Sequence, residues 1–393
     1  MKKNFIFIAL FTLLLAKEHP YTILISFDGF RWDYLHRGLT PNIDTLQQNG
    51  ISAISLKPSY PSITFPNHIS IISGKYPENH NIIANFFYNP SKKKKYAIYD
   101  TIEVRNPEWY NCEAFWQTAN KNGIKTASYF WPYSDVNDKA KRPFIYKKYE
   151  HLFPYEKRID SIISWLQLPS NIRPKFITLY FDATDTYGHK YGPKSAKIDS
   201  VIQKLDFLTG ILIKKLRKIN LYDSTNIILV SDHGMAEIKG VINISNTLKK
   251  YDYEKIASGT FFTLKSKDYK KIYNELKKNE NNYKIFLKNE IPSWLNFKNA
   301  KYLGDILIIP EIGYIITDVM DEYEAKLKAS HGWDNNNIEM HGIFVACGPS
   351  FKNNYHIGTV SNVDIYPMLC KIYNLKYNHK IDGKLENIEF ILK

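Results

Sequence analysis

The sequence predicts an α/β fold: a doubly wound, mostly parallel central sheet with helices on both faces. Three observations lead to this prediction. Short, nearly continuous apolar runs such as Tyr21–Phe27 are typical of parallel strands buried on both faces. These runs alternate with amphipathic segments of helical period, of which residues 196–217 are the longest. Acidic residues and histidines follow several runs directly, and the carboxyl edge of such a sheet is where ligands bind.

The predicted elements follow one another from the amino terminus. After the strand Tyr21–Phe27, Thr40 and Pro41 begin a helix, because threonine caps helices and proline fits their first position. Thr64 is the predicted N-cap of a short helix at residues 65–73. The other predicted elements are strands at residues 52–56, 124–130, 176–181, 226–230 and 342–346 and helices at residues 113–122 and 196–217.

Residues 241–323 break this alternation. They combine short apolar runs with a lysine-rich helical pattern near Tyr269–Lys278. We interpret them as a smaller α+β insertion within a single catalytic domain that covers residues 17–393. The chain shows no internal repeat and no long linker, so a second independent domain is not expected.

The first sixteen residues resemble a secretory signal peptide. Lys2 and Lys3 precede an apolar run at residues 5–16 that is too short to span a membrane and ends in a small residue. Leu14 makes the cleavage pattern imperfect, which leaves an uncleaved anchor as the alternative. No other segment is apolar and long enough to cross a bilayer. We therefore expect a secreted or periplasmic protein.

The net charge and the cysteine content exclude few classes of protein. The formal charge of +14 would attract polyanions, but the lysine run at residues 92–95 has no interleaved aromatic residues, so no specific nucleic-acid partner is predicted. Three cysteines, Cys112, Cys347 and Cys370, are too few for a disulfide framework, although one bridge stays open. The sequence makes no prediction of oligomeric state.

Ligand-type residues gather after the predicted strands. Each alone has an ordinary structural explanation, such as a turn aspartate, a helix cap or a hydrogen-bonded histidine. Together they offer oxygen and nitrogen ligands without a thiolate, enough for two zinc or similar divalent ions. The six residues are Asp28, Asp185, His189, Asp232, His233 and His331.

Two further residues are candidates for phosphate chemistry. Thr64 is either a simple helix cap or a hydroxyl nucleophile held at the positive end of a helix. Asn85 is either a turn residue or a hydrogen-bond donor to a phosphate oxygen. With two metal ions, this combination indicates metal-assisted hydrolysis of a phosphate ester.

Seven short motifs follow one another along the chain. They are ISFDGFR at residues 25–31, TPN at 40–42, PSITFPNH at 61–68, GKYPENH at 74–80, FWP at 130–132, SDHGM at 231–235 and HGWDN at 331–335. Together they resemble the nucleotide pyrophosphatase/phosphodiesterase family of the alkaline phosphatase superfamily. The resemblance covers nearly all of residues 21–352, and it implies an alkaline-phosphatase-like fold.

The resemblance also implies a role for each matching residue. Asp185, His189 and His331 look like the ligands of one zinc. Asp28, Asp232 and His233 look like the ligands of a second zinc, with the Thr64 oxygen on that metal. Asn85 looks like the phosphate-oxygen donor. The substrate pocket would contain Phe65 and Tyr149, which match an aromatic pair around a nucleobase, with Trp131 and Asp135 in its neighbouring wall.

The sequence departs from the family pattern at a few positions. Ala183 and Thr184 stand where Glu-Pro usually precedes the aspartate ligand, and Tyr133 replaces a glycine, which we expect to narrow the pocket. The cysteine-rich amino-terminal modules and the nuclease-like carboxyl-terminal domain of large animal members have no counterpart in the sequence. The resemblance thus implies a stand-alone catalytic domain.

The expected function is a secreted two-zinc phosphodiesterase and nucleotide pyrophosphatase. It would act through a phosphothreonine intermediate on small nucleotide substrates and release nucleoside 5′-monophosphates. Three alternatives stay open: a phosphodiesterase for choline phospholipids or glycerophosphodiesters, a phosphomonoesterase, and a catalytically inactive binding protein on the same fold. The motifs show no dedicated arginine at the site, which suits a diester better than a dianionic monoester.

Overall fold

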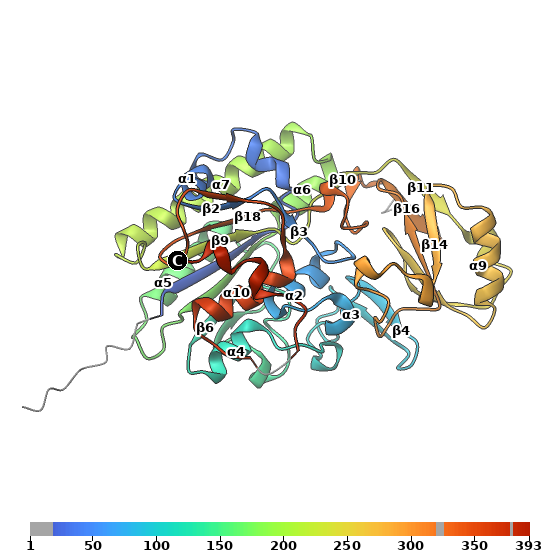
Figure 1. The fold of residues 1–393 in the computed structure, drawn as a ribbon, viewed down its shortest axis with the longest axis horizontal. Helices are drawn as coiled ribbons and strands as arrows, with labels where there is room; N and C mark the ends of the chain where they lie inside the picture. Colours follow the sequence, from blue (N-terminus) through green and yellow to red (C-terminus); the bar gives the residue numbers. More distant parts are fainter. Residues whose placement is uncertain (1–18, 320–325, 378–379) are drawn as a thin grey trace, which may run out of the picture.

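The structure of the protein is a computed structural model that describes residues 19–319, 326–377 and 380–393. The predicted signal peptide at residues 1–16 lies outside the described residues. The chain forms a large α/β body and, at the right of Figure 1, a smaller part rich in strands. Within the described ranges, no helix has the length and apolar character needed to cross a membrane.

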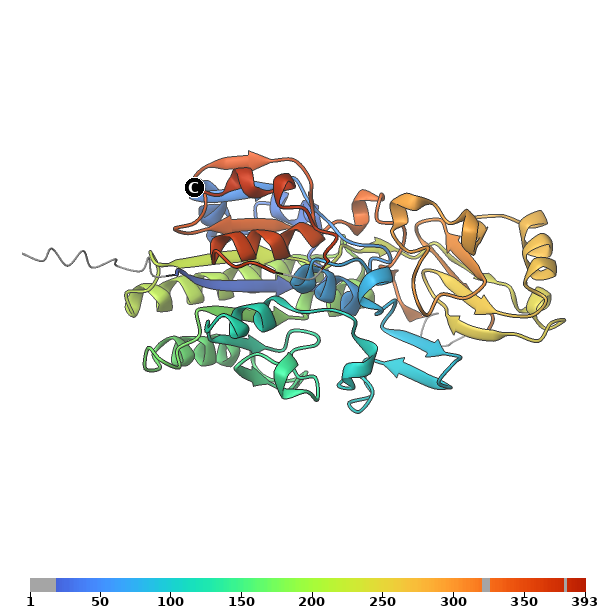
Figure 2. The ribbon, with the colours of Figure 1, turned by 60° about the horizontal axis from the view of Figure 1, so that its bottom comes forward.

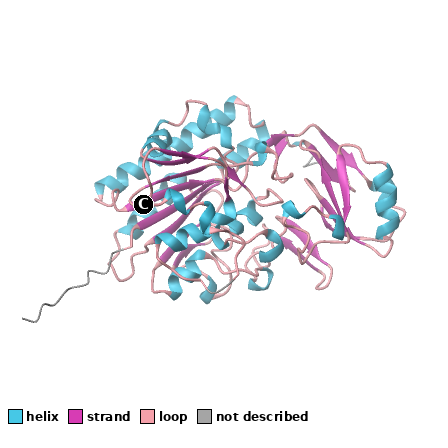
Figure 3. Cartoon of the chain, in the orientation of Figure 1, coloured by secondary structure: helices cyan, strands magenta, loops and turns pink. Residues whose placement is uncertain are grey.

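An eight-stranded mixed sheet forms the centre of the large body (Figure 3). Its central strand β1 lies between β8 and β9, and both are parallel to it. The last residue pairs are Phe27 with Phe181 on one side and Ser26 with Val230 on the other. The three strands therefore end level with one another. Only β18, among the eight, runs antiparallel to its neighbours. In spatial order the strands are β19 (Tyr355–Ile357), β2 (Gly50–Ala53), β18 (Phe344–Cys347), β9 (Thr225–Val230), β1 (Tyr21–Phe27), β8 (Phe176–Phe181), β6 (Thr126–Tyr129) and β7 (Ile145–Lys147).

Helices pack on both faces of this sheet, as predicted (Figure 2). Along β1, Ile23, Ile25 and Phe27 join the apolar cluster of one face, and Leu24 joins the cluster of the other, as the alternation of a strand requires. One face is covered by α1 (Pro41–Gln48), α5 (Tyr155–Leu166) and α7 (Ala196–Lys218), and the other by α2 (Thr64–Ser73), α4 (Phe115–Lys121) and α10 (Ile365–Ile372).

A second sheet lies within residues 241–323. Four antiparallel strands pack against α9 (Tyr269–Lys278) around an apolar core of their own. In spatial order they are β12 (Glu254–Ala257), β13 (Phe262–Lys265), β15 (Ile306–Pro310) and β14 (Tyr283–Leu287), and β11 (Gly240–Asn243) pairs separately with β16 (Tyr314–Thr317). The division of residues 17–393 into a catalytic domain with an insertion stays a prediction.

Some predicted boundaries are wrong. The predicted strand at residues 52–56 is split, because β2 belongs to the central sheet whereas β3 (Leu56–Lys57) pairs with β20 (Val360–Ser361). All three cysteines are free, so no bridge forms among them. The connections contain α3 (Pro77–His80), α6 (Ala183–Tyr191), α8 (Ser245–Leu248), β4 (Phe86–Asn89), β5 (Lys94–Ala97), β10 (Ala236–Glu237) and β17 (Ala329–Ser330).

Candidate active site

Strand β1 carries Asp28 to the carboxyl edge of the sheet. The Asp28 N–H donates to the carbonyl of Phe181 over 2.9 Å, which holds Asp28 level with the end of β8. Gly29 follows with a φ of +65°, and a Cβ there would lie 2.9 Å from the Cα of Asp185. Glycine therefore lets the chain after β1 approach the start of α6 closely, which brings two carboxylates together.

Helix α6 presents Asp185 and His189 on one face, because residues four apart are neighbours on a helix. Nε2 of His189 lies 3.2 Å from Oδ1 of Asp185, and Nε2 of His331 lies 3.4 Å from the same oxygen. Each imidazole donates its Nδ1 hydrogen to a backbone carbonyl, His189 to Ala329 at 2.8 Å and His331 to Ser62 at 2.9 Å. These bonds leave both Nε2 atoms as available ligands.

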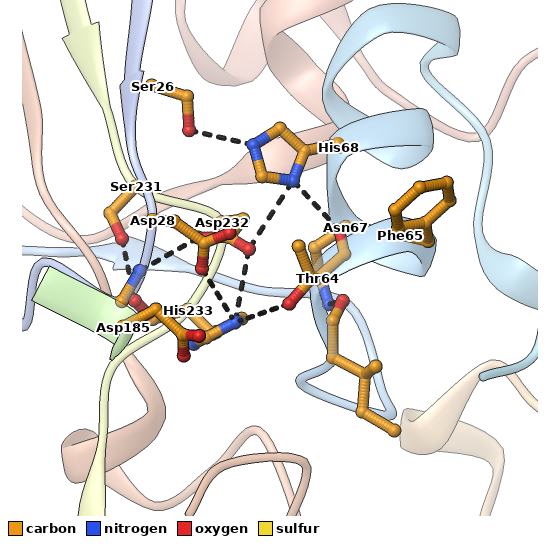
Figure 4. Close-up of polar contacts among 12 residues, drawn as sticks. Ser26, Asp28, Thr64, Phe65, Asn67, His68, Asp185, Ser231, Asp232 and His233 are labelled. Carbon is orange, nitrogen blue, oxygen red and sulfur yellow. Dashed lines mark hydrogen bonds and ion pairs between the residues drawn. The ribbon is translucent and has the colours of Figure 1, made fainter. Parts of the chain in front are cut away.

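The turn after β9 brings Asp232 and His233 to the same place (Figure 4). Nε2 of His233 lies 3.1 Å from Oδ2 of Asp232 and 3.3 Å from Oδ1 of Asp28. The same nitrogen lies 3.2 Å from the Thr64 hydroxyl, and Nδ1 of His233 donates to the carbonyl of Gly234 at 2.8 Å. The second predicted ligand group and the predicted nucleophile therefore meet in space.

The donor set fits metal ions. Oδ1 of Asp28, Oδ1 of Asp185 and Oδ2 of Asp232 are buried and make no hydrogen bond within the described residues. The other oxygens of two of these carboxylates are held: Oδ2 of Asp28 accepts from the Tyr180 hydroxyl at 2.5 Å, and Oδ1 of Asp232 accepts from the Gly29 N–H at 3.1 Å. Buried carboxylate oxygens without donors are costly unless a cation binds them.

Three overlapping groups have ligand atoms within 4.8 Å of one another. They are Asp185 with His189 and His331, Asp28 with Asp185 and His233, and Asp28 with His68 and Asp232. Imidazole nitrogens and carboxylate oxygens without a thiolate suit zinc or another divalent transition ion. The groups share members, so ions held here would be neighbours.

The electrostatics of the unliganded side chains point the same way. Burial raises the pKa of Asp28 well above its usual value, and the nearby Asp232 and Asp185 raise it further. Burial lowers the pKa of His331 to about 3, and His233 adds to the effect, so the His331 ring is neutral and able to act as a ligand. Positive charge at this point would relieve the repulsion among the carboxylates.

Helix α2 begins at Thr64, so the prediction of Thr64 as the N-cap is wrong. Ile63 is the N-cap, and the Phe65 N–H is satisfied from outside the helix by Oδ1 of Asn85 at 3.0 Å. Because Asn85 takes this capping role, the Thr64 hydroxyl is free to face His233 at the positive end of the helix. The Nδ2 donor of Asn85 makes no hydrogen bond within the described part of the chain.

A cavity of about 860 Å³ opens onto these groups. Its lining includes every predicted pocket residue: Thr64, Phe65, Asn85, Trp131, Asp135 and Tyr149. Tyr149 is 46% exposed, its ring lies 5.3 Å from that of Phe130, and its hydroxyl lies 3.0 Å from Nδ1 of His151. A cavity of this size, lined by aromatic side chains together with many polar and charged groups, has the character of a site for a small polar molecule.

Tyr133, one of the departures from the expected pattern, also lines this cavity. Tyr133 has a φ of 78°, a conformation that favours glycine, and its buried ring stacks on Tyr110 with centroids 4.4 Å apart. That stacking holds a strained backbone in place. Asp135 is paired with Arg105 at 2.7 Å, and Arg105 also lines the cavity. The charge of Asp135 is therefore balanced before any substrate enters.

Two residues around the site were missed by sequence reasoning. Tyr180, in β8, fixes one oxygen of Asp28, and His68, in α2, lies between Thr64 and Asp232. For His68 the sequence did give an indication, its spacing. His68 follows Thr64 by four residues, so both share a helix face. An apolar strand residue such as Tyr180 offers no comparable pattern, because its partner comes from a neighbouring strand.

Comparison with known proteins decides the family. The sequence profile of the type I phosphodiesterase / nucleotide pyrophosphatase family matches residues 22–334. The chain belongs to this family. The predicted family is confirmed, and this family is named for the hydrolysis of phosphodiester and nucleotide pyrophosphate bonds.

Three relatives illustrate the similarity. Human ectonucleotide pyrophosphatase/phosphodiesterase family member 1 is 36% identical over 91% of this chain and 40% of its own length. Venom phosphodiesterase 2 of Crotalus adamanteus is 34% identical over 94% of this chain and 48% of its own. The chain thus spans less than half of these two proteins. Bis(5′-adenosyl)-triphosphatase enpp4 of Xenopus laevis is 31% identical over 95% of this chain and 82% of its own.

Solved structures confirm the fold prediction. An inactive threonine-to-alanine variant of murine ectonucleotide pyrophosphatase/phosphodiesterase 5, in complex with AMP, superimposes with a TM-score of 0.88 at 28% identity. The match covers 95% of this chain and 100% of the murine chain. The human protein of the same name matches with a TM-score of 0.87. The alkaline-phosphatase-like α/β fold is therefore established for this family member.

Proposed function

We propose that this protein hydrolyses the phosphodiester or pyrophosphate bond of small nucleotides and releases a nucleoside 5′-monophosphate. The observation that carries the proposal is the meeting of Thr64 with two carboxylate–histidine groups beside a cavity that has aromatic side chains in its lining. The names of the human and snake relatives describe a nucleotide pyrophosphatase/phosphodiesterase and a phosphodiesterase, and the name of the frog relative describes a bis(5′-adenosyl)-triphosphatase. The AMP held by the murine relative is a product of this class.

The proposed cofactor is two zinc ions. Asp185, His189 and His331 would hold one ion. Asp28, Asp232 and His233 would hold the other, next to the Thr64 oxygen. When bound, the two ions would supply positive charge that favours the ionised Thr64 hydroxyl and balances charge on the phosphoryl oxygens.

Thr64 is the proposed nucleophile. Its Oγ1 would form a bond to phosphorus as the bond to the leaving oxygen breaks, giving a phosphothreonine and a free alcohol or phosphate. The Thr64 hydroxyl releases its proton to solvent as it ionises, and the leaving oxygen takes up a proton from solvent. Water then attacks the phosphothreonine, which releases the nucleoside 5′-monophosphate and restores the hydroxyl. The inactivity of the murine threonine-to-alanine variant is in keeping with an essential threonine in the family.

Asn85 and the aromatic residues would bind the substrate. Oδ1 of Asn85 is already bonded to the Phe65 N–H, so its Nδ2 is the group that would donate to a non-bridging phosphoryl oxygen. Phe65 and Tyr149 would stack on the nucleobase, and Trp131 and Asp135 would form the adjoining wall. We propose a secreted or periplasmic location, since the residues before the fold have the pattern of a signal peptide.

A panel of substrates tests the proposal. Purified protein with zinc would be assayed on p-nitrophenyl thymidine 5′-monophosphate, ATP, a dinucleoside polyphosphate, p-nitrophenyl phosphorylcholine and p-nitrophenyl phosphate. We expect turnover of the nucleotide substrates. A preference for the phosphorylcholine ester would favour the lipid-headgroup alternative, since aromatic side chains also bind quaternary ammonium groups. A preference for p-nitrophenyl phosphate would favour a monoesterase, and no turnover with two bound ions would favour a binding protein.

A further inference from the structure

His68 lies at the junction between the nucleophile and one ligand group. Its side chain is fully buried in α2, one helical turn after Thr64. Nδ1 lies 2.9 Å from the carbonyl oxygen of Thr64 and 3.4 Å from Oδ2 of Asp232, and Nε2 lies 2.8 Å from the Ser26 hydroxyl. Figure 4 shows the ring joined to all three neighbours. One imidazole therefore connects strand β1, helix α2 and the turn after β9.

The neighbours of the ring determine where its proton lies. Both atoms near Nδ1, the Thr64 carbonyl oxygen and the Asp232 carboxylate oxygen, are acceptors. Nδ1 therefore carries a hydrogen, and Nε2 accepts from the Ser26 hydroxyl. For His68 to bind a metal through Nδ1, the proton would have to move to Nε2, and the Thr64 carbonyl would then face a lone pair.

The walls around the ring keep it in this orientation. The His68 ring makes edge contacts with Trp131 and Tyr180, with centroids 5.0 Å and 5.3 Å apart. The indole Nε1 of Trp131 donates to the His68 carbonyl at 3.1 Å. Because the ring is enclosed on several sides, it has no room to turn toward the cavity.

We propose that His68 is a positioning residue that ties the Thr64 backbone to the ligand Asp232, and that it is not itself a metal ligand. The assignment of Asp232 as a ligand rests on the proposed function. Nδ1–H is hydrogen-bonded to the Thr64 carbonyl and makes a longer electrostatic contact, at 3.4 Å, with Oδ2 of Asp232. Through these two contacts His68 would hold the first turn of α2 and the Oδ2 edge of Asp232 at a constant separation. The Thr64 hydroxyl would then lie at a constant distance from the ion that Asp232 binds. Residues that hydrogen-bond metal ligands commonly fix the position of those ligands in this way.

Two substitutions of His68 distinguish the effect of losing its Nδ1–H donor from the effect of losing its side-chain volume. The amide of asparagine lies near the position of a histidine Nδ1, so His68→Asn keeps a donor to Thr64 and Asp232. The amide of glutamine lies near the position of Nε2, so His68→Gln keeps the reach to Ser26 and loses the donor. His80→Gln is the matched control: His80 is also fully buried and bonded to a serine, Ser70 at 3.1 Å, but it contacts none of the proposed ligands.

The first measurement is zinc binding by competition with a chromophoric chelator, which needs no activity. For His68→Gln we expect two ions at saturation, with one binding step weakened about 10–100-fold and the other unchanged, the usual range for an outer-shell partner. His68→Asn should stay within a few fold of the wild type, and His80→Gln should match it. Saturation at one ion would show that His68 is a ligand, and equal effects in His68→Gln and His80→Gln would show a purely structural role. Either result overturns the proposal.

The second measurement is the pair of kinetic constants on p-nitrophenyl thymidine 5′-monophosphate. His68→Gln should lower kcat about 10–100-fold with little change in KM, because Thr64 is displaced while the pocket is intact. A rise in KM at unchanged kcat would contradict a role in positioning the nucleophile. If the wild type hydrolyses no nucleotide, the proposed function fails, and the zinc measurement still decides the role of His68.

Discussion

Replacing Thr64 by alanine should abolish the chemistry while leaving the fold stable. Within the described part of the chain the Thr64 hydroxyl makes one hydrogen bond, with Nε2 of His233 at 3.2 Å, and it does not cap α2. Losing such a hydrogen bond costs about 0.5–1.5 kcal/mol, and alanine's better helix propensity returns about 0.5 kcal/mol. The free energy of unfolding should therefore fall by less than about 1.5 kcal/mol. Loss of the nucleophile should slow turnover at least a thousandfold, which corresponds to about 4 kcal/mol of transition-state stabilisation.

The assay compares wild type, Thr64→Ala and Thr64→Ser on p-nitrophenyl thymidine 5′-monophosphate, with zinc content and urea unfolding measured on the same samples. Acid quenching followed by mass spectrometry should find phosphate on Thr64 in the wild type. Thr64→Ser keeps a hydroxyl and should keep measurable turnover. Near-normal turnover of Thr64→Ala with two bound ions would refute the covalent mechanism. A large loss of stability in Thr64→Ala would refute the view that Asn85 caps α2 in its place.

Three further predictions follow from the pocket, the ligand groups and a distant histidine. Tyr149→Ala should raise KM for nucleotide esters roughly tenfold, since a stacking contact is worth about 1–3 kcal/mol, and should spare a small ester without a base; equal losses on both would indicate a structural role. Chelation should abolish activity and lower Tm, because Asp28 and its neighbours are then left as mutually repelling buried carboxylates, and zinc should restore both; a Tm insensitive to chelator would contradict the metal sites. Burial lowers the pKa of His80 to about 3, so below about pH 6.5 the unfolded chain binds a proton that the folded chain does not, and stability falls as the pH drops toward 3. In urea unfolding, His80→Gln should reduce the slope of the free energy of unfolding against pH by about 1.4 kcal/mol per pH unit between about pH 6 and pH 4. An unchanged slope would contradict the lowered pKa of His80.

Much of the central sheet was predictable because its strands carry their own pattern. Tyr21–Phe27 and Phe176–Phe181 are nearly continuous apolar runs, and the structure has strands with those same bounds. The long helix after α6 was predicted at residues 196–217 and spans Ala196–Lys218. Where a strand belongs to another sheet the prediction fails, as at residues 52–56, because apolar content does not specify the partner strand.

The ligand-type residues were also visible in the sequence, since aspartates and histidines after buried strands are uncommon. The geometry that brings these residues together into one site was not visible in the sequence. Gly29 allows the close approach of Asp28 to Asp185, and Asn85, twenty-one residues after Thr64, takes over the capping of α2. Neither relation has a local pattern, because each joins residues that meet only after the chain has folded.

The sequence by itself determined the secondary structure of the buried strands, the set of six ligand-type residues and the family, because each depends on residue type and spacing along the chain. The tertiary structure alone decided that Thr64 faces His233, that His68 lies against both Thr64 and Asp232, and that three buried carboxylate oxygens make no hydrogen bond within the described residues. These are contacts between elements, and their energy depends on distances and burial that arise only when strands β1, β8 and β9 end at one edge of the sheet.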